Sequence, residues 1–334
     1  MAGLSFGDLA QSYLTRSRLG HLKSETVRLA QELGSGRTSD VARAVAGDTS
    51  RLGAITHRRE LLDAFTRAGH EIETRTRVRE SALDAIKANL EMVRDTTMPL
   101  LQDASRAQIL RAAETARQGF SAAMERLNTD HAGRSVFSGI AVAGPALVPP
   151  ADVLSELDRL LGTISDPEVI ALTITEWFQN PAGFTAFAYL GGAAGADLKI
   201  SDDGSHVTEI TAVDNDIRDA LSGLAVAAFL DRATLSDAGP DRITLITRAT
   251  ETLQFGAGSL TELLANIGSA RQLIDQSLSR NEAELLSLGT LETTLIGVDP
   301  AQAATELEAT RANLETAYAV TARLSRLSLA EYMR

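Results

Sequence analysis

Two long apolar stripes, one in each half of the chain, restrict its folding most strongly. The first occupies residues 49–98 and repeats every seven residues at two positions: Ile55, Leu62, Leu83 and Leu90, and Phe65, Ile72, Ile86 and Val93. The second follows 247–296 at Leu260, Leu263, Leu264, Ile267, Ile274, Leu278, Leu285, Leu288 and Leu295. A seven-residue apolar repeat is typical of helices packed lengthwise. We expect two helices of roughly 70 Å each, at 1.5 Å per residue, joined antiparallel in one rod.

Break signals divide the rest of the chain. "GSGRTSD" at 34–40 interrupts a helical pattern over 5–33, and Pro99 ends the long helix before another at 103–131. "GVDPAQ" at 297–302 contains a glycine, Gly297, that is expected to end one helix and Asp299 to cap the next. Pro300 then stands at the first helical position, and Gln302 completes a capping-box arrangement. The predicted segments are 1–48, an N-terminal helix; 49–136, the ascending helices; 137–246, an insert; 247–297, the descending helix; and 298–334, a C-terminal helix.

The insert is expected to mix helices with a little β-structure. "ADLKISDDGSHVTEI" alternates on both sides of Asp203-Gly204, which predicts a β-hairpin, and helical patterns cover 152–163 and 215–231. Trp177 and Phe178 are interpreted as core rather than a ligand platform. "DNDIRD" at 214–219 indicates a helix N-terminus rather than a calcium loop, and "GAGSLTEL" at 256–263 a helix capped by Ser259 rather than a nucleotide loop. The predicted fold class is mainly α, a long antiparallel helical hairpin with a small α+β insert.

Composition argues against several functions. Aromatic residues make up only 4% of a chain that is 44% hydrophobic, which favours narrow helical seams over a thick core. The net charge of −12 is unsuited to nucleic acid or an anionic membrane surface. The longest apolar run, 223–230, is too short to span a membrane, and the first residues lack the pattern of a signal peptide.

Catalytic and metal-binding patterns are missing from the sequence. There is no cysteine, no Gly-x-Ser-x-Gly and no phosphate-cradling loop. The histidines show no ligand pairing one helical turn apart: His21, His57, His70, His131 and His206. We expect no enzyme, cofactor or metal.

Both ends of the chain resemble the flagellin family. "LEATRANLETAYAVTARLSRLSLAEYMR" at 307–334 is similar to its C-terminal signature, and "RLAQELGSGRTSDVARAVAGDTSRL" at 28–52 to its N-terminal counterpart. "GRSVFSG" at 133–139 and "YLGGAAGADLKISDDG" at 189–204 resemble the hook–filament junction branch, hook-associated protein 3. The opening lacks the repeated Asn and Ser of filament flagellins, which also favours that branch.

The resemblance implies a structural subunit of the bacterial flagellum, an adaptor at the hook–filament junction. Such a protein is exported unfolded by type III export, without a cleaved signal peptide, and acts outside the cell. Its implied partners are copies of itself in a ring, the adjacent hook-associated protein, flagellin on the filament side and a cytoplasmic export chaperone. The alternatives are a filament flagellin, or a ligand-binding or enzymatic insert on a helical stalk.

In this family the terminal segments are disordered in the monomer and pack with neighbouring subunits on assembly, so 1–48 and 298–334 become export and assembly helices. The residues expected to form that assembly interface lie on the apolar stripes of the two segments: Phe6, Leu9, Tyr13, Leu22, Leu29, Leu33, Leu307, Leu314, Ala317, Tyr318, Thr321, Leu324, Leu327 and Leu329.

Overall fold

The structure is a computed structural model that describes residues 6–102, 105–195, 198–201, 206–207, 209–232 and 239–332. Side chains are described within those ranges from residue 13 to residue 323, except at 198 and 206–207. The chain is mainly α, as the sequence predicts, with a small amount of antiparallel strand in the middle.

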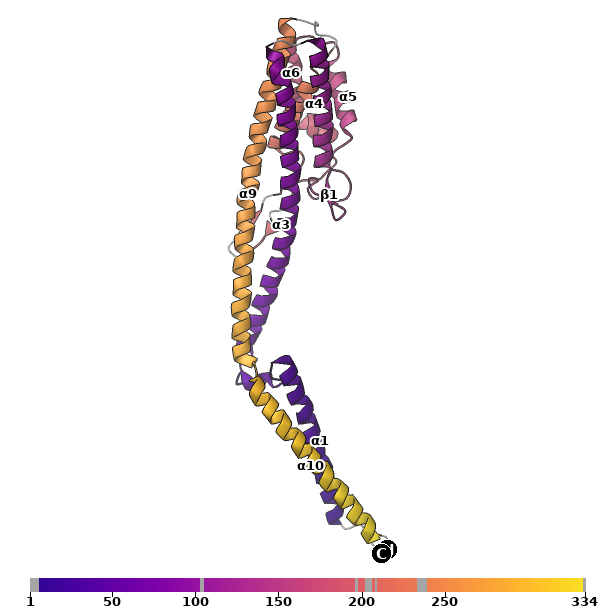
Figure 1. Cartoon of the computed structure of the whole chain (residues 1–334), viewed down its shortest axis with the longest axis vertical. Helices are drawn as coiled ribbons and strands as arrows, with labels where there is room; N and C mark the ends of the chain where they lie inside the picture. The colour runs from indigo at the N-terminus through magenta and orange to yellow at the C-terminus, as the bar shows by residue number, and fades with distance from the viewer. Residues whose placement is uncertain are drawn as a thin grey trace. The chain divides into compact units, whose positions relative to one another are not determined.

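Figure 1 shows the helices and strands, which in chain order are α1 (Phe6–Ser35), α2 (Val41–Ala44), α3 (Ser50–Thr97), η1 (Met98–Leu101), α4 (Arg106–Leu127), β1 (Asp130–His131), β2 (Arg134–Ser135), α5 (Pro150–Leu161), α6 (Pro167–Gln179), η2 (Pro181–Thr185), α7 (Ala186–Ala188), β3 (Leu198–Lys199), β4 (His206–Val207), α8 (Asn215–Ala228), α9 (Pro240–Ile296) and α10 (Pro300–Tyr332).

These elements form two compact units. Unit 1 contains Met1–Asp63 and Glu282–Arg334, and unit 2 contains Ala64–Asn281. The long helices α3 and α9 contribute to both. The finer five-segment division expected from the sequence stays a prediction.

Unit 1 brings together the beginning and the end of the chain. Helices α1 and α10 pack against each other (Figure 1). The first turns of α3 and the last turns of α9 are joined by ion pairs, one of which links Arg58 to Glu284 at 2.6 Å. The unit is therefore built from segments more than two hundred residues apart in the sequence.

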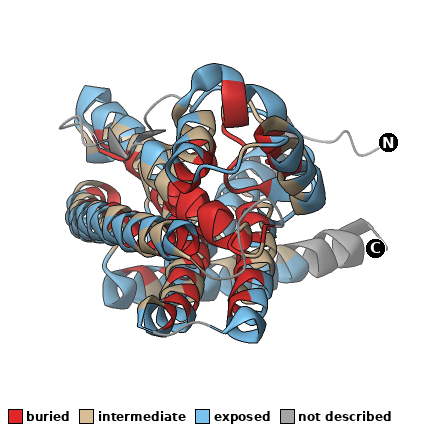
Figure 2. Ribbon diagram, turned by 90° about the horizontal axis from the view of Figure 1, so that it is seen from above, coloured by how far each residue is buried: buried red, intermediate tan, exposed pale blue. Residues whose placement is uncertain are grey.

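Unit 2 is organised around α8, which packs against α4 and α6. Every residue from 220 to 228 is buried, so the apolar run noted in the sequence is the centre of this unit's core. Phe120, Phe178 and Phe184 are fully buried beside it, and Trp177 packs edge-on against Phe178. Figure 2 shows buried residues gathered where helices face one another. The core assignment is confirmed for Phe178, whereas Trp177 is half-buried and packs against the edge of that core.

The predicted β-hairpin is confirmed as β3 and β4, which pair antiparallel with Leu198 opposite Val207. Its turn, at Asp203-Gly204, lies outside the described residues. Ile200, which follows β3, is buried with Ile72 of α3 and Ile274 and Leu278 of α9 in a second, smaller apolar cluster. Within unit 2 the hairpin strand thus ends on the seam between the two long helices.

The prediction for Ser259 is wrong. Helix α9 begins at Pro240, before the predicted residue 247, and continues without a break past Ser259. Gly256, which suggested a break, is required for close packing: a Cβ there would lie 2.7 Å from Cα of Ala220 on α8. A second glycine, Gly258, faces open space. The two glycines are tolerated inside a helix whose other residues pack along its length.

Other helix ends agree with their sequence signals. Asp299 accepts hydrogen bonds from the amides of Ala301 (2.8 Å) and Gln302 (3.4 Å), as a cap of α10 should. The predicted capping box is not formed: among the described hydrogen bonds, the Gln302 side chain donates to Glu306 one turn later rather than accepting from the Asp299 amide. Asp40 caps the short α2, and Asp214 precedes α8, so "DNDIRD" lies at a helix N-terminus as predicted.

Candidate assembly interface

The predicted interface residues lie on α1 and α10 in unit 1, with very different exposures. Leu29 and Leu307 are buried, whereas Tyr13 is 74% exposed and Tyr318 is 53% exposed. Leu33 is also exposed, and four further members are half-buried: Leu22, Leu314, Ala317 and Thr321. The side chains of Phe6, Leu9, Leu324, Leu327 and Leu329 lie outside the described set. For all of the predicted interface residues, a role in assembly stays a prediction.

The seam between α1 and α10 is only partly filled. A groove of about 460 Å³ lies between them, and its lining is mixed, with apolar residues such as Leu14 and Val320 beside polar ones such as Arg18. Leu14, at 66% exposed, is mostly open to solvent. Side chains of α10 that line this groove, such as Ala317, are small, and larger side chains at these positions would fill it. The helix pair therefore presents apolar surface that its own contacts do not cover.

Three exposed apolar residues in this region were missed by the sequence analysis: Leu14, Val27 and Val320. Helical spacing could have found Val320, which is three residues after Ala317. Leu14 directly follows Tyr13, so the two side chains lie on different faces of α1 and a single stripe contains only one of them. The stripe chosen from a seven-residue repeat was too narrow. Apolar residues on α1 and α10 spread over more than one face.

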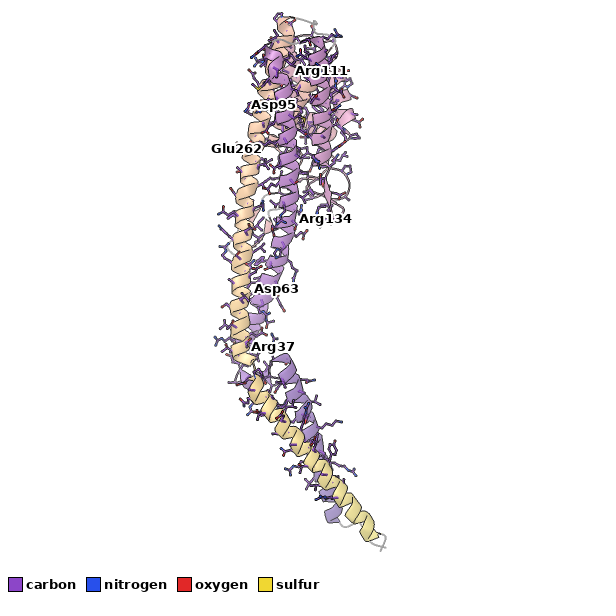
Figure 3. The ribbon with its side chains drawn as sticks, in the orientation of Figure 1. Arg37, Asp63, Asp95, Arg111, Arg134 and Glu262 are labelled. Atoms are coloured by element: carbon purple, nitrogen blue, oxygen red, sulfur yellow. The ribbon has the colours of Figure 1, made fainter. Side chains whose placement is uncertain are left out.

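The connector between α1 and α2 is fixed by two buried carboxylates. Glu32 accepts hydrogen bonds from the Ser39 amide at 2.8 Å and from Arg28 at 2.8 Å. On the other side, Glu292 of α9 pairs with Arg37 at 2.9 Å and with Arg59 of α3. Arg37, which is labelled in Figure 3, lies in this connector. Burial alone would raise the pKa of Glu32, but these hydrogen bonds hold it below its usual value.

A second buried ion cluster lies in unit 2. Glu209 pairs with Arg75 and, at 2.8 Å, with Arg79, both from α3. The Arg79 side chain, itself buried, also donates to the Val136 carbonyl at 3.0 Å. Burial would raise the pKa of Glu209, but the hydrogen bond from Arg79 and the two guanidinium charges lower it. This arrangement satisfies buried charges and ties the segment before α8 to the long helix.

Metal sites and membrane spans are both missing from the described part of the chain. Within the described residues, no group of three or more His, Asp or Glu side chains is placed to hold a metal ion. Among the helices that the structure describes, none combines the length and the apolar character needed to cross a membrane.

Comparison with known proteins finds a likeness in structure but not in sequence. No protein-family profile matches, and no curated protein matches by sequence. A Vibrio parahaemolyticus protein assigned as a flagellar hook-associated protein superposes with a TM-score of 0.51 at 11% identity, over 74% of this chain and 96% of its own. Bacillus cereus FlgL gives 0.49 at 14% identity, over 72% of this chain and 99% of its own.

The structural comparison agrees with the resemblance found in the sequence. At 11% identity the likeness to the Vibrio protein concerns the fold. Over about three quarters of its length, this chain has the fold of a flagellar hook-associated protein.

Proposed function

We propose that this chain is a structural, non-enzymatic subunit of the bacterial flagellum, an adaptor at the junction between hook and filament. The observation that carries the proposal is the helix pair α1–α10, which joins the two chain ends and leaves apolar residues such as Tyr13 and Tyr318 exposed. The fold shared with the Vibrio flagellar hook-associated protein supports the same role.

In this role the helix pair is the adhesive part of the subunit. Exposed apolar residues on α1 and α10 would be buried against neighbouring copies in a ring, against the adjacent hook-associated protein and against flagellin. Burial of apolar surface is the main favourable contribution to such association, and it offsets the cost of ordering the helices. The chain would reach this position by export in an unfolded form, guided by a cytoplasmic chaperone, and would act outside the cell.

Deletion of the gene in the organism of origin tests the proposal. We expect cells that do not swim, that carry hooks without filaments and that release unpolymerised flagellin into the medium. Expression of the intact chain should restore filaments. Loss of flagellin itself from the medium would instead identify the chain as the filament subunit, and normal filaments in the deletion strain would contradict both roles.

A further inference from the structure

A small hollow in unit 2, between α3 and the β1–β2 hairpin, plays no part in the proposed assembly. Its volume of about 330 Å³ is at the lower end of the range for ligand sites, and all of its lining residues belong to unit 2. The segment "GRSVFSG" at 133–139 supplies part of one wall, and α3 supplies the opposite wall. The polar lining residues are Glu71, Thr74 and Arg75 of α3 and His131, Arg134 and Ser135 of the hairpin.

The hairpin places two basic side chains at this hollow. His131 and Arg134 are paired across the two strands, on either side of a turn in which Ala132 (φ 52°) and Gly133 (φ 75°) both have a left-handed backbone. The side chains of such a pair lie on the same face of the hairpin. Arg134, labelled in Figure 3, has a single described ion pair, with Glu71 at 3.8 Å, and its side chain is 59% exposed. Its guanidinium group is therefore only loosely held.

The α3 side of the hollow has an excess of positive charge. Arg75 and Arg79 both donate through Nη2 to the same oxygen of Glu209, Oε1, while Oε2 accepts from a backbone amide at 3.0 Å. One carboxylate thus faces two guanidinium groups. The next carboxylate, Asp214, accepts from the Thr211 hydroxyl at 2.8 Å and forms no ion pair with either Arg among the described residues. Arg75, which lines the hollow, has further N–H donors to offer.

Ser135 is a second, independent observation at the same place. The residue is only 5% exposed, and its Oγ is buried without a hydrogen-bond partner among the described residues. A buried hydroxyl without a hydrogen bond costs free energy, and an anion oxygen is a strong acceptor for it. Ser138 also has a buried hydroxyl without a partner in the described part of the chain, but it does not line the hollow. It is therefore a matched control.

We propose that this hollow binds one oxyanion group, a phosphate or a carboxylate, held by Arg75, Arg134 and Ser135. A planar guanidinium group suits either anion, because its parallel N–H donors match two oxygens of the same group. Glu71 competes for Arg134 in the free protein, and the anion replaces that long contact with shorter ones. The inference concerns unit 2 alone and does not rest on the flagellar role.

Isothermal titration of the full-length protein in a chloride buffer of low ionic strength tests the proposal. Inorganic phosphate and succinate are titrated separately, and we expect saturable binding of at least one of them at one site per chain. Binding of phosphate alone would identify a phosphate site, binding of succinate alone a carboxylate site, and binding of both a site that accepts either group. The absence of saturable binding for both anions would overturn the proposal.

Two charge substitutions locate the anion. Arg134→Gln should weaken its affinity roughly tenfold, because a charged hydrogen bond is lost. Glu71→Gln should strengthen it about twofold, because Arg134 is released from its exposed partner. The control is Arg77→Gln, which removes an exposed guanidinium group of α3 that pairs with Glu73 and does not line the hollow. An equal loss in the control would show attraction to positive charge in general and would contradict a defined site.

The two unpartnered serines complete the test. Ser135→Ala should weaken the affinity about threefold to tenfold, whereas Ser138→Ala should leave it within twofold of wild type. Wild-type affinity in either Arg134→Gln or Ser135→Ala would place the anion elsewhere and overturn the assignment. Normal filaments in a deletion strain would contradict the flagellar role and leave these binding results intact.

Discussion

Two glycines set the distance between α8 and α9 in the core of unit 2. A Cβ at Gly223 would lie 2.8 Å from the Thr252 carbonyl oxygen, and one at Gly256 would lie 2.9 Å from that of Asp219. Both contacts are with backbone, which cannot turn aside as a side chain can. The two helices can therefore cross this closely only because glycine has no side chain at these two positions.

Gly256→Ala should destabilise the protein by about 1–3 kcal/mol, because overpacking forces the two backbones apart. Gly258→Ala is the control, since a Cβ there meets nothing within 4 Å and alanine favours a helix by about 1 kcal/mol. Urea unfolding measures both. Equal stabilities for the two variants would show that the helices do not approach as closely as described.

Glu209 is the carboxylate partner of two α3 guanidinium groups. Glu209→Gln should cost about 3 kcal/mol of unfolding free energy, because it leaves the buried Arg79 without its ionic partner. Glu73→Gln breaks an outward ion pair with the exposed Arg77 and should cost less than about 1 kcal/mol. A similar loss of unfolding free energy in both variants would show that the buried ion cluster stabilises the protein no more than an exposed ion pair does.

The same carboxylate predicts a pH dependence. The pKa of Glu209 in the folded protein is below its ordinary value of 4.5, because paired guanidinium groups favour the charged form over the cost of burial. Its stabilising effect is therefore complete above about pH 4.5 and is lost as the pH falls through the lowered pKa. Between pH 5 and pH 3 the wild-type protein should lose more stability than Glu209→Gln. Parallel curves from thermal unfolding would contradict this.

Among the helices, α4 has a complete N-terminal cap. The Ser105 hydroxyl accepts from the Gln108 amide, and the Gln108 side chain accepts from the Ser105 amide at 2.9 Å. Ser105→Ala should therefore lower stability by about 1 kcal/mol. Ser155→Ala, in the exposed middle of α5, should stay within about 0.5 kcal/mol of wild type. Thermal unfolding of the two variants separates a capping effect from a general loss of hydroxyl groups.

The long helices and the hairpin could be predicted because their signals are local. Apolar repeats, Pro99, Pro300 and the Asp203-Gly204 turn each act within a few residues. Ser259 was misassigned because a glycine that permits a helix crossing and a glycine that ends a helix look the same in sequence. Only the position of Ala220 on α8 distinguishes them for Gly256.

The sequence places the candidate interface on the two terminal helices, but it does not predict which of its residues are buried. Leu29 and Tyr13 belong to the same apolar pattern, yet one is buried and the other is exposed. Leu29 lies beside the connector, where Thr38 and Val298 line the same hollow, and the connector itself is held by the ion pair of Arg37 with Glu292. No local sequence pattern predicts an ion pair between two residues that are so far apart in the chain.

In the molecule as a whole, the two chain ends share unit 1 while the middle of the chain forms unit 2 with its own core. The residues that fold the free subunit and the residues proposed to join it to its neighbours are thus largely separate. A substitution at an exposed residue of α1 or α10 can then impair assembly without impairing folding.

The exposed tyrosines of the helix pair test that separation. Tyr13→Ser and Tyr318→Ser should leave the free energy of unfolding within about 0.5 kcal/mol of wild type, because both side chains are largely in solvent. In cells they should reduce swimming and filament attachment, because the apolar surface offered to neighbours shrinks. Leu286→Ser is the control: Leu286 is 75% exposed on α9 of unit 1, outside the predicted interface. Normal swimming in both tyrosine variants, or an equal defect in the control, would remove α1 and α10 as the adhesive surface, since exposure without consequence is the behaviour of ordinary solvated residues.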